Sequence, residues 1–421
     1  GYRHFDTARA YENEAALGRA LNKWIGADAA KRKELFVVTK LPPGGNRPDL
    51  VPEYFEASFK DLGLEYIDLY LMHTPFAFEH VPGDLHPKNP DGTMKVDHST
   101  DLLAVWKVKV SYGAPVENHY SKTATEEKNS FLSNILFCCS WNKRKKGVTE
   151  LVKDLSTKNA IKNIETHEVN LCTVNRYNFG CQYSLNSNHS LEINSHSLSR
   201  SVSQVLTRES VNNLQWGRNF RRHNKYQRPL VIKDESFSES DDNYSLIKLK
   251  ESGRVRHVGV SNLNAEQLSR VCAVQRPACL QVEVHALCQQ AALADEAQRL
   301  GVPIVAYSPL GSKALADALA EKTGREYPDL LQLDVVKRIA QAHSRSPAQV
   351  LLRHNLQRGL AAIPKSTNPE RIKQNISVWD FELTPEEMGE LAALDRGENG
   401  RICDFSFFLG IDEHPEFPFK K

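Results

Sequence analysis

The sequence has almost no net charge and no long apolar run. Its 54 Lys and Arg residues nearly balance its 52 Asp and Glu residues, which leaves a formal charge of +2. Such a chain has no field that would attract nucleic acid or a membrane surface. No apolar run approaches the roughly 20 residues that span a bilayer, and no signal segment is visible. We therefore expect a soluble, cytoplasmic monomer whose partner is a small molecule.

Two common kinds of motif are also missing. The 8 cysteines show no paired Cys-x-x-Cys spacing, so neither a zinc site nor a disulfide framework is indicated. We expect reduced thiols and no bound metal. No Gly-x-Gly-x-x-Gly turn follows a first strand, which argues against a doubly wound nucleotide-binding domain.

Asn and Ser are concentrated in the middle of the chain. Residues 108–244 contain 17 Asn and 18 Ser among 137 residues, with weak apolar periodicity. These side chains compete with the backbone for hydrogen bonds, and such a segment buries too little apolar surface to offset its ordering entropy. We expect an insertion that is mostly disordered. It separates residues 1–107 from residues 245–400, and a C-terminal tail follows at 401–421.

The place of the insertion is unusual. "DLLAVWK" ends at Lys107 and "LIKLKESGRVRHVGVSN" resumes at Leu246; joined, they read as one amphipathic helix that leads into a strand. Natural insertions favour loop tips, whereas this one interrupts a helix. It is therefore either translated intervening sequence, or a gene-model artefact, or an inserted functional domain.

Outside the insertion, short β-branched or aromatic runs alternate with helical patterns. This alternation is typical of βα units and a parallel sheet, and seven runs that end on polar residues indicate a (β/α)8 TIM barrel. Since the first run starts beside Gly1, we expect the barrel's first strand to lie upstream. The strand runs are 2–7, 35–40, 67–73, 254–262, 280–286, 303–309 and 360–366; the helical patterns are 13–25, 52–62, 265–274, 291–300, 331–343 and 347–356.

Four polar residues follow or close the first three of these runs: Asp6, Tyr11, Lys40 and His73. In a barrel, strand ends converge on one mouth. A lysine ammonium lowers the pKa of a neighbouring tyrosine, a carboxylate can hold that lysine, and a neutral histidine can orient a carbonyl group. Taken singly, each residue has an ordinary structural explanation. Taken as a set in barrel order, they predict proton transfer to a carbonyl.

Several longer motifs extend this pattern. "GYRHFDTARAYENEAALGRAL", "LFVVTKL" and "IDLYLMHTP" are followed, after the insertion, by "GVSN", "QVEVH", "AYSPLGS" and "IPKSTNPERIKQN". Their order and spacing resemble those of the aldo-keto reductases, NADPH-dependent carbonyl reductases built on a TIM barrel. The resemblance covers residues 1–107 and 245–400.

The resemblance implies a role for each of the strand-end residues. Tyr11 would be the general acid, Lys40 its partner, Asp6 the anchor of the lysine, and His73 the residue that orients the substrate. Thr74 would lie in the substrate pocket, at a position where the family often has tryptophan.

The resemblance also implies a binding site for NADPH. The residues implied are Tyr307, under the nicotinamide; Ser261, Asn262 and Gln281, at its carboxamide; Ser308, Leu310 and Ser312, along the pyrophosphate; Lys365, Ser366 and Arg371, at the 2′-phosphate; and Gln374 and Asn375, at the adenine. A lysine, a hydroxyl and a guanidinium also suit a phosphate monoester on physical grounds, and a strand-to-helix turn offers free backbone N–H groups. A site with these three side-chain groups favours NADPH, which carries the 2′-phosphate, over NADH.

Two segments should set the choice of substrate, residues 76–101 and the tail 401–419. The tail contains five phenylalanines that either wall an apolar pocket or pack the tail onto the barrel. We expect an NADPH-dependent reductase of aldehydes or ketones, such as sugar aldehydes, glyceraldehyde or aromatic aldehydes. The alternatives are a nicotinamide-binding regulatory subunit and an inactive truncated product.

Overall fold

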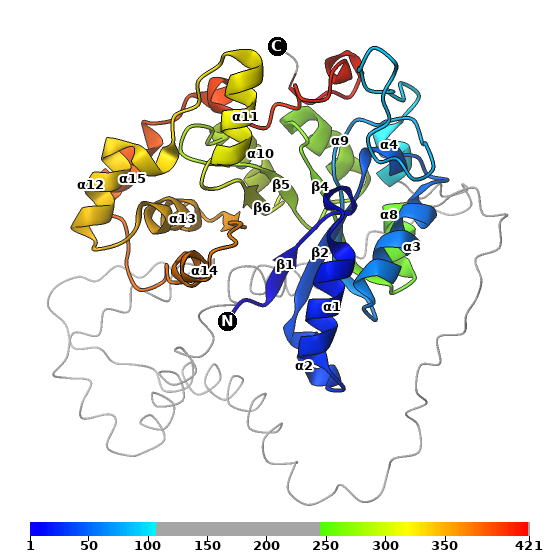
Figure 1. The fold of residues 1–421 in the computed structure, drawn as a ribbon, viewed down its shortest axis with the longest axis horizontal. Coiled ribbons are helices and arrows are strands. Elements are labelled where there is room, and N and C mark those ends of the chain that lie inside the picture. The colour runs from blue at the N-terminus through cyan, green and yellow to red at the C-terminus, as the bar shows by residue number, and fades with distance from the viewer. Residues whose placement is uncertain (107–244, 420–421) are drawn as a thin grey trace, which may run out of the picture. The chain divides into compact units, whose positions relative to one another are not determined.

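The protein is represented by a computed structural model that describes residues 1–106 and 245–419 (Figure 1). All of these residues belong to one compact unit. The predicted insertion at 108–244 lies outside the described residues.

Each of the seven runs of β-forming residues contains a strand. Within the described residues the strands form one parallel sheet whose spatial order follows the chain order. Side chains of the central strands are buried on both faces, as expected for parallel strands between helices and a barrel interior. The strands are β1 (His4–Asp6), β2 (Phe36–Leu41), β3 (Ile67–Met72), β4 (Val255–Ser261), β5 (Leu280–Glu283), β6 (Ile304–Tyr307) and β7 (Ala361–Ala362).

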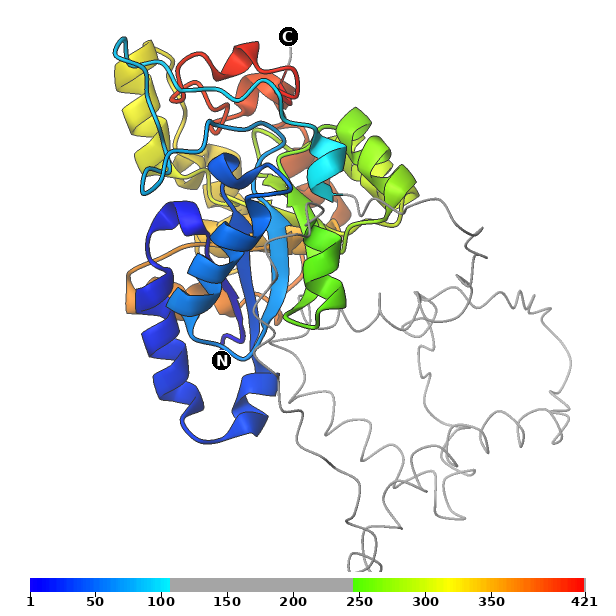
Figure 2. The same cartoon turned by 90° about the vertical axis from the view of Figure 1, so that its right-hand side faces the viewer.

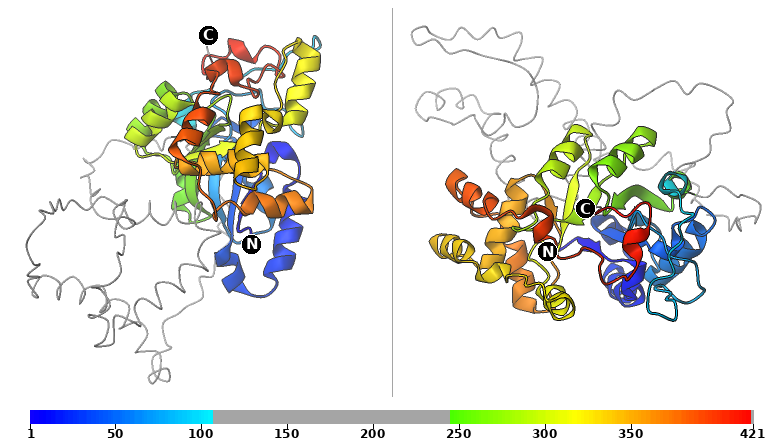
Figure 3. Two further views of the ribbon diagram at one scale, coloured as in Figure 1. Left: turned by 90° about the vertical axis from the view of Figure 1, so that its left-hand side faces the viewer. Right: turned by 90° about the horizontal axis from the view of Figure 1, so that it is seen from above.

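Helices follow the strands and lie outside the curved sheet, as the view from above in Figure 3 shows. The six predicted helical patterns are all observed. The chain also forms α2, α11, α14 and α15, which periodicity did not predict. The helices are α1 (Glu14–Ile25), α2 (Ala29–Glu34), α3 (Val51–Leu62), α4 (Leu102–Trp106), α8 (Leu246–Glu251), α9 (Ala265–Val274), α10 (Ala291–Arg299), α11 (Lys313–Thr323), α12 (Asp334–Ala342), α13 (Pro347–Gln357), α14 (Pro369–Ile376) and α15 (Pro385–Ala392).

The segments on either side of residues 107–244 form two helices, α4 and α8. Helix α8 has its own start, because the Ser245 side chain accepts a hydrogen bond from the Lys248 N–H. A serine N-cap is a common start of a helix. That the two segments would form a single helix if they were joined stays a prediction.

The seven parallel strands curl into a half-barrel in the order of a (β/α)8 barrel, which confirms the predicted fold class. The carboxyl ends of the strands lie at the end of the sheet where the C-terminal tail and the loop at 76–101 meet. Figure 2 shows these two segments side by side, and they are joined by the hydrogen bond from the Met94 N–H to the Leu409 carbonyl, at 2.8 Å. Strand ends, loop and tail therefore enclose a common space.

Candidate active site

The four strand-end residues lie together. The Lys40 ammonium, fully buried on β2, donates to Asp6 Oδ1 on β1 at 2.5 Å and to the Thr7 carbonyl at 2.7 Å. Its Nζ atom is 5.1 Å from the centre of the Tyr11 ring. That ring in turn is 5.7 Å from the His73 ring, at an interplanar angle of 79°. The beginning of the chain and the next two strands thus supply one cluster.

Backbone structure explains the spacing within the cluster. The register pairs Asp6 with Val38 in the parallel β1–β2 ladder, which brings the end of β1 close to Lys40. After β1 the chain makes a short 3₁₀ turn (Arg9–Tyr11), which is closed by a hydrogen bond of 3.0 Å from the Tyr11 N–H to the Ala8 carbonyl. This turn brings Tyr11 back over the strand ends.

The environment shifts the pKa values of both members of the Lys40–Tyr11 pair. Burial lowers the pKa of Lys40, but Asp6 and Tyr11 together outweigh it, so the pKa of Lys40 lies above its ordinary value. For Tyr11, desolvation raises the pKa and Lys40 lowers it, and the net shift is upward. The predicted lowering by Lys40 is therefore one contribution to the shift, and desolvation acts against it. The raised pKa keeps Tyr11 a protonated phenol at neutral pH, which is the form that an acid must have.

His73 is held in its neutral form. Burial, followed by the charges of Lys40 and His86, lowers the pKa of His73 to about 3. Its Nδ1 atom is buried and has no hydrogen-bond partner in the described part of the chain. A neutral imidazole carries one N–H, so His73 can donate one hydrogen bond to a carbonyl oxygen beside Tyr11.

Polar residues of β4, β5 and β6 form a second network next to this cluster. The Tyr307 hydroxyl donates to Asn262 Oδ1 at 2.8 Å, and Asn262 Nδ2 donates to the His73 carbonyl at 2.8 Å. Ser261 Oγ donates to the Gln281 carbonyl at 2.7 Å. Gln281 Nε2 donates to Asp6 Oδ2 at 2.7 Å, which joins the network to the Lys40–Asp6 pair.

One cavity of about 830 Å³ contains most of the predicted residues. Three of its wall residues, Asn262, Ser308 and Phe405, have left-handed backbones with φ of 61°, 48° and 61°. Non-glycine residues in this region are uncommon and gather at functional sites. The predicted residues on the wall are Asp6, Tyr11, His73, Thr74, Ser261, Asn262, Gln281, Tyr307, Ser308, Lys365, Ser366 and Asn375.

Five predicted residues do not line this cavity. Lys40 is completely buried behind its wall. Leu310 packs against the helices near α12, and Ser312 is the residue before α11. Arg371 and Gln374 are exposed on α14.

Two cationic side chains were predicted at the phosphate end of the site: Lys365, which lines the cavity, and Arg371, which lies on α14. Among the described residues, neither Lys365 nor Arg371 forms an ion pair, so both are free to meet an anion. The first-turn amides of α14 are less free than predicted, because the N–H groups of Glu370 and Arg371 both donate to Asn368 Oδ1 at 3.0 Å. Side chains rather than these two amides are therefore available to a phosphate.

The tail phenylalanines combine the two predicted roles. All five pack in one apolar cluster of the tail, and Phe405, Phe407 and Phe408 also line the cavity, whereas Phe417 and Phe419 do not. Thr74, which has a small side chain, is buried on the cavity wall. The wall facing a substrate is thus apolar on the side of the tail.

Sequence reasoning missed two groups at the site. Cys403 of the tail lies on the cavity wall, and burial raises the pKa of its thiol to about 12. Glu283 and His285 lie completely buried where the tail leaves the barrel. The sequence did offer a signal for Glu283: it lies within the apolar run "LQVEVHA", and a carboxylate buried in such a strand requires hydrogen-bond partners.

Two kinds of feature are absent from residues 1–106 and 245–419. No group of three or more His, Cys, Asp or Glu side chains there is placed to hold a metal ion. None of the helices described is long and apolar enough to cross a membrane.

Comparisons with known proteins point to one family. The model of the Aldo/keto reductase family matches residues 1–107 and 185–396. Aldo-keto reductase family 1 member A1 of Mus musculus is 30% identical over 399 residues, 94% of this chain and 78% of its own length. Its counterpart in Gallus gallus is 29% identical over 400 residues, with the same coverage of the two chains.

Solved structures show the same fold. The aldose reductase from Schistosoma japonicum superposes with a TM-score of 0.57 at 25% identity, covering 100% of this chain and 87% of that one. The Bombyx mori aldo-keto reductase, solved in complex with NADP, gives a TM-score of 0.56 at 24% identity and covers 100% of this chain and 85% of its own.

Proposed function

Because the chain belongs to the aldo/keto reductase family, whose chemistry is NADP-dependent oxidoreduction of carbonyl compounds, we propose that it reduces aldehydes or ketones to alcohols with NADPH. The observation that carries the proposal is the juxtaposition of Tyr11, Lys40, Asp6 and His73 at a cavity that is also lined by most of the implied cofactor residues.

The residues present fit such a cofactor. Tyr307 offers an aromatic face, and Ser261, Asn262 and Gln281 offer hydroxyl and amide groups on the same wall. Lys365 and Arg371, which have no carboxylate partner in the described part of the chain, suit an additional phosphate. NADPH supplies a hydride when bound.

The chain's own residues complete the reduction. The His73 N–H orients the carbonyl oxygen, and the Tyr11 hydroxyl gives its proton to that oxygen as the carbon accepts the hydride. The resulting phenolate lies against the Lys40 ammonium, which Asp6 and the Thr7 carbonyl hold in place. Lys40 therefore stabilises the charge that Tyr11 acquires.

The wall of the cavity narrows the choice of substrate. Phe405, Phe407 and Phe408 make the tail side apolar, which favours aromatic aldehydes over sugar aldehydes and glyceraldehyde. Cytoplasmic location and a monomeric state stay predictions from the sequence.

A direct assay tests the proposal. The purified full chain is expected to consume NADPH when an aromatic aldehyde is added, and the alcohol should appear in equal amount. NADPH binding without aldehyde-dependent consumption would instead support the regulatory alternative.

The pH dependence follows from the two shifted pKa values. Reduction requires neutral His73, whose pKa is about 3, and protonated Tyr11, whose pKa is raised. We expect kcat/KM for reduction to stay level across neutral pH and to fall only above the ordinary phenol pKa of about 10. Oxidation of the alcohol, which needs the phenolate, should rise over that alkaline range. A steep change in kcat/KM near neutral pH would contradict these assignments.

The cations beside the cavity predict the choice between nicotinamide cofactors. Replacing Lys365 and Arg371 by methionine should raise the Kd for NADPH about tenfold or more, because charge-assisted bonds to phosphate are lost, and should leave the weaker binding of NADH unchanged. Lys373→Met is the matched control, since Lys373 lies on α14 with Arg371 but forms an ion pair with Glu370. Equal effects on both cofactors, measured by fluorescence titration, would argue against a phosphate site.

A further inference from the structure

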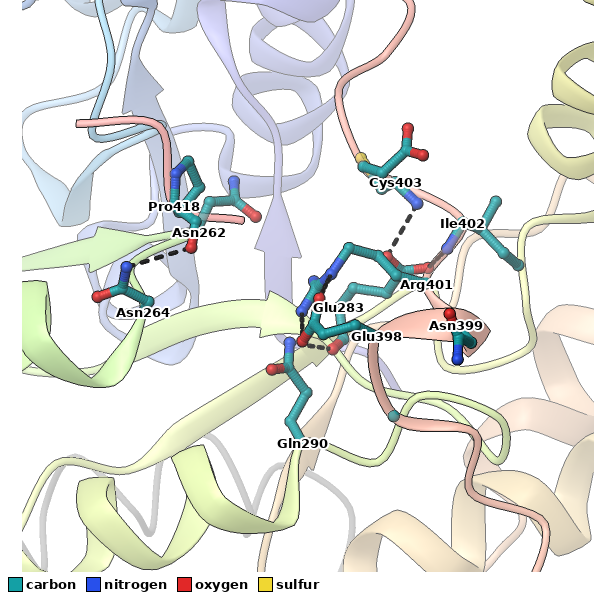
Figure 4. Close-up of polar contacts among 12 residues, drawn as sticks. Asn262, Asn264, Glu283, Gln290, Glu398, Asn399, Arg401, Ile402, Cys403 and Pro418 are labelled. Atoms are coloured by element: carbon teal, nitrogen blue, oxygen red, sulfur yellow. Dashed lines mark hydrogen bonds and ion pairs between the residues drawn. The ribbon is translucent and has the colours of Figure 1, made fainter. Parts of the chain in front are cut away.

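Glu283, at the end of β5, holds the backbone of the C-terminal tail. Its carboxylate is fully buried and accepts two backbone hydrogen bonds, from the Ile402 N–H to Oε1 at 3.1 Å and from the Cys403 N–H to Oε2 at 2.9 Å (Figure 4). A carboxylate with two amide donors is a strong, directional anchor. The two oxygens fix two successive peptide groups, and hence the direction in which the tail leaves.

His285 restrains this carboxylate from the other side. The Leu287 N–H donates to His285 Nδ1 at 3.3 Å, so in the neutral ring the proton is on Nε2. That Nε2 donates to Glu283 Oε1 at 3.0 Å. Both side chains are completely buried, so neither has a competing solvent partner.

The root of the tail fits tightly at the same place. The Arg396 N–H donates to the Leu287 carbonyl at 2.9 Å. A Cβ atom on Gly400 would lie 1.7 Å from that carbonyl oxygen, a distance that no side chain permits. Only glycine therefore lets the backbone come close enough for Ile402 and Cys403 to reach Glu283.

The residues that follow this anchor form one wall of the cavity. Cys403, Phe405, Phe407 and Phe408 all line it, whereas Glu283 does not. We call residues 403–408 the wall segment. Farther along the tail, Glu416 forms an ion pair with Arg270 of α9 at 2.7 Å. Asn264, the residue before α9, donates from Nδ2 to the Pro418 carbonyl at 3.1 Å. The tail is thus held to the barrel both before and after the wall segment.

We propose that Glu283 is a positioning residue for substrate selectivity: through the amides of Ile402 and Cys403 it sets where the wall segment lies over the cavity. It touches neither substrate nor cofactor. The proposal rests on the proposed reductase function, because it concerns the substrate side of the same cavity.

The test is Glu283→Gln in the full chain. Glutamine keeps one acceptor oxygen, but it presents an NH₂ group to the second backbone donor, so one anchor bond is lost. We expect KM for a bulky aromatic aldehyde to rise about tenfold, with kcat, KM for a small aliphatic aldehyde and the Kd for NADPH unchanged. A purely structural role would alter stability without separating the two substrates.

Asp68→Asn is the matched control. Asp68 is also a buried carboxylate, bonded to Arg32 Nη2 at 2.8 Å and to the Val37 N–H at 2.9 Å, but it lies at the start of β3, away from the tail. This variant should lower stability and leave the ratio of the two KM values unchanged.

Gly400→Ala provides an independent route to the same displacement. It moves the tail root away from Leu287 while Glu283 stays intact, so it should reproduce the shift in the KM ratio even if Glu283→Gln fails to fold. An unchanged ratio in the variants that fold would overturn the proposal.

Hydrogen exchange supplies a readout that needs no turnover. Peptides covering residues 401–408 should exchange about tenfold faster in Glu283→Gln and Gly400→Ala than in the parent chain, and not in Asp68→Asn. If the parent chain reduces no aldehyde, the proposed function fails, while exchange still decides whether Glu283 anchors the tail. Unchanged exchange in the folded tail variants would exclude the anchor itself.

Discussion

Replacing Tyr11 by phenylalanine is expected to lower kcat/KM for aldehyde reduction about a thousandfold while the Kd for NADPH stays the same. The substitution removes the only proton that the proposed mechanism delivers to the carbonyl oxygen. It keeps the ring that lies 5.7 Å from His73 and 5.1 Å from the Lys40 Nζ atom. Turnover with NADPH and an aromatic aldehyde, together with a cofactor titration, measures both quantities.

Tyr54→Phe is the control for this substitution. Tyr54 also carries a hydroxyl in a hydrogen bond, to His80 Nδ1 at 3.0 Å, but it lies on α3 and does not line the large cavity. Loss of the Tyr54 hydroxyl should leave kcat/KM for aldehyde reduction unchanged. If Tyr11→Phe retained a tenth or more of the parent activity, another group would have to supply the proton.

The arrangement of the strands was predictable because each carries a strong local pattern. Runs such as "LFVVTK" and "IDLYLMH" are β-branched or apolar, and they end on the polar residues Lys40 and His73. In a parallel barrel the strand ends share one face, so strand-end residues that are far apart along the chain are expected to lie together. The clustering of Asp6, Lys40 and His73 follows from that rule.

Two of the four unpredicted helices have few apolar residues. Helix α2, "AAKRKE", is only six residues long and almost wholly polar, and α14, "PERIKQNI", has only two apolar residues besides its proline. Both are stabilised by N-caps from side chains, Asp28 and Asn368, which periodicity does not report. The Asn368 cap also uses the amides that the sequence suggested were free.

The pKa of Tyr11 and the role of Glu283 depend on burial, which no single stretch of sequence specifies. Lys40 lowers the phenol pKa, as the adjacent charges predict, while partial desolvation of the half-exposed Tyr11 side chain acts against that attraction. Glu283 meets Ile402 and Cys403 across more than a hundred residues of chain. Such pairings emerge only when the tail folds back over the strand ends.

Replacing Lys40 by methionine is expected to cause the largest combined loss of activity and stability. The ammonium is fully buried and donates to Asp6 at 2.5 Å, so its removal leaves the carboxylate with Gln281 as its remaining side-chain donor. Breaking a buried pair by removing one partner costs about 3 kcal/mol of unfolding free energy. Reduction should fall at least a hundredfold or so, because the phenolate formed at Tyr11 loses its stabilising charge.

The double variant Lys40→Met with Asp6→Asn separates the two effects. An asparagine at position 6 is uncharged and can still accept from Gln281 Nε2, so most of the lost unfolding free energy should return. Activity should not return, since the ammonium beside Tyr11 is still missing. Chemical denaturation and NADPH turnover of the two variants test this directly. If activity recovered along with stability, Lys40 would act only by holding the fold, and its proposed role in proton transfer would be wrong.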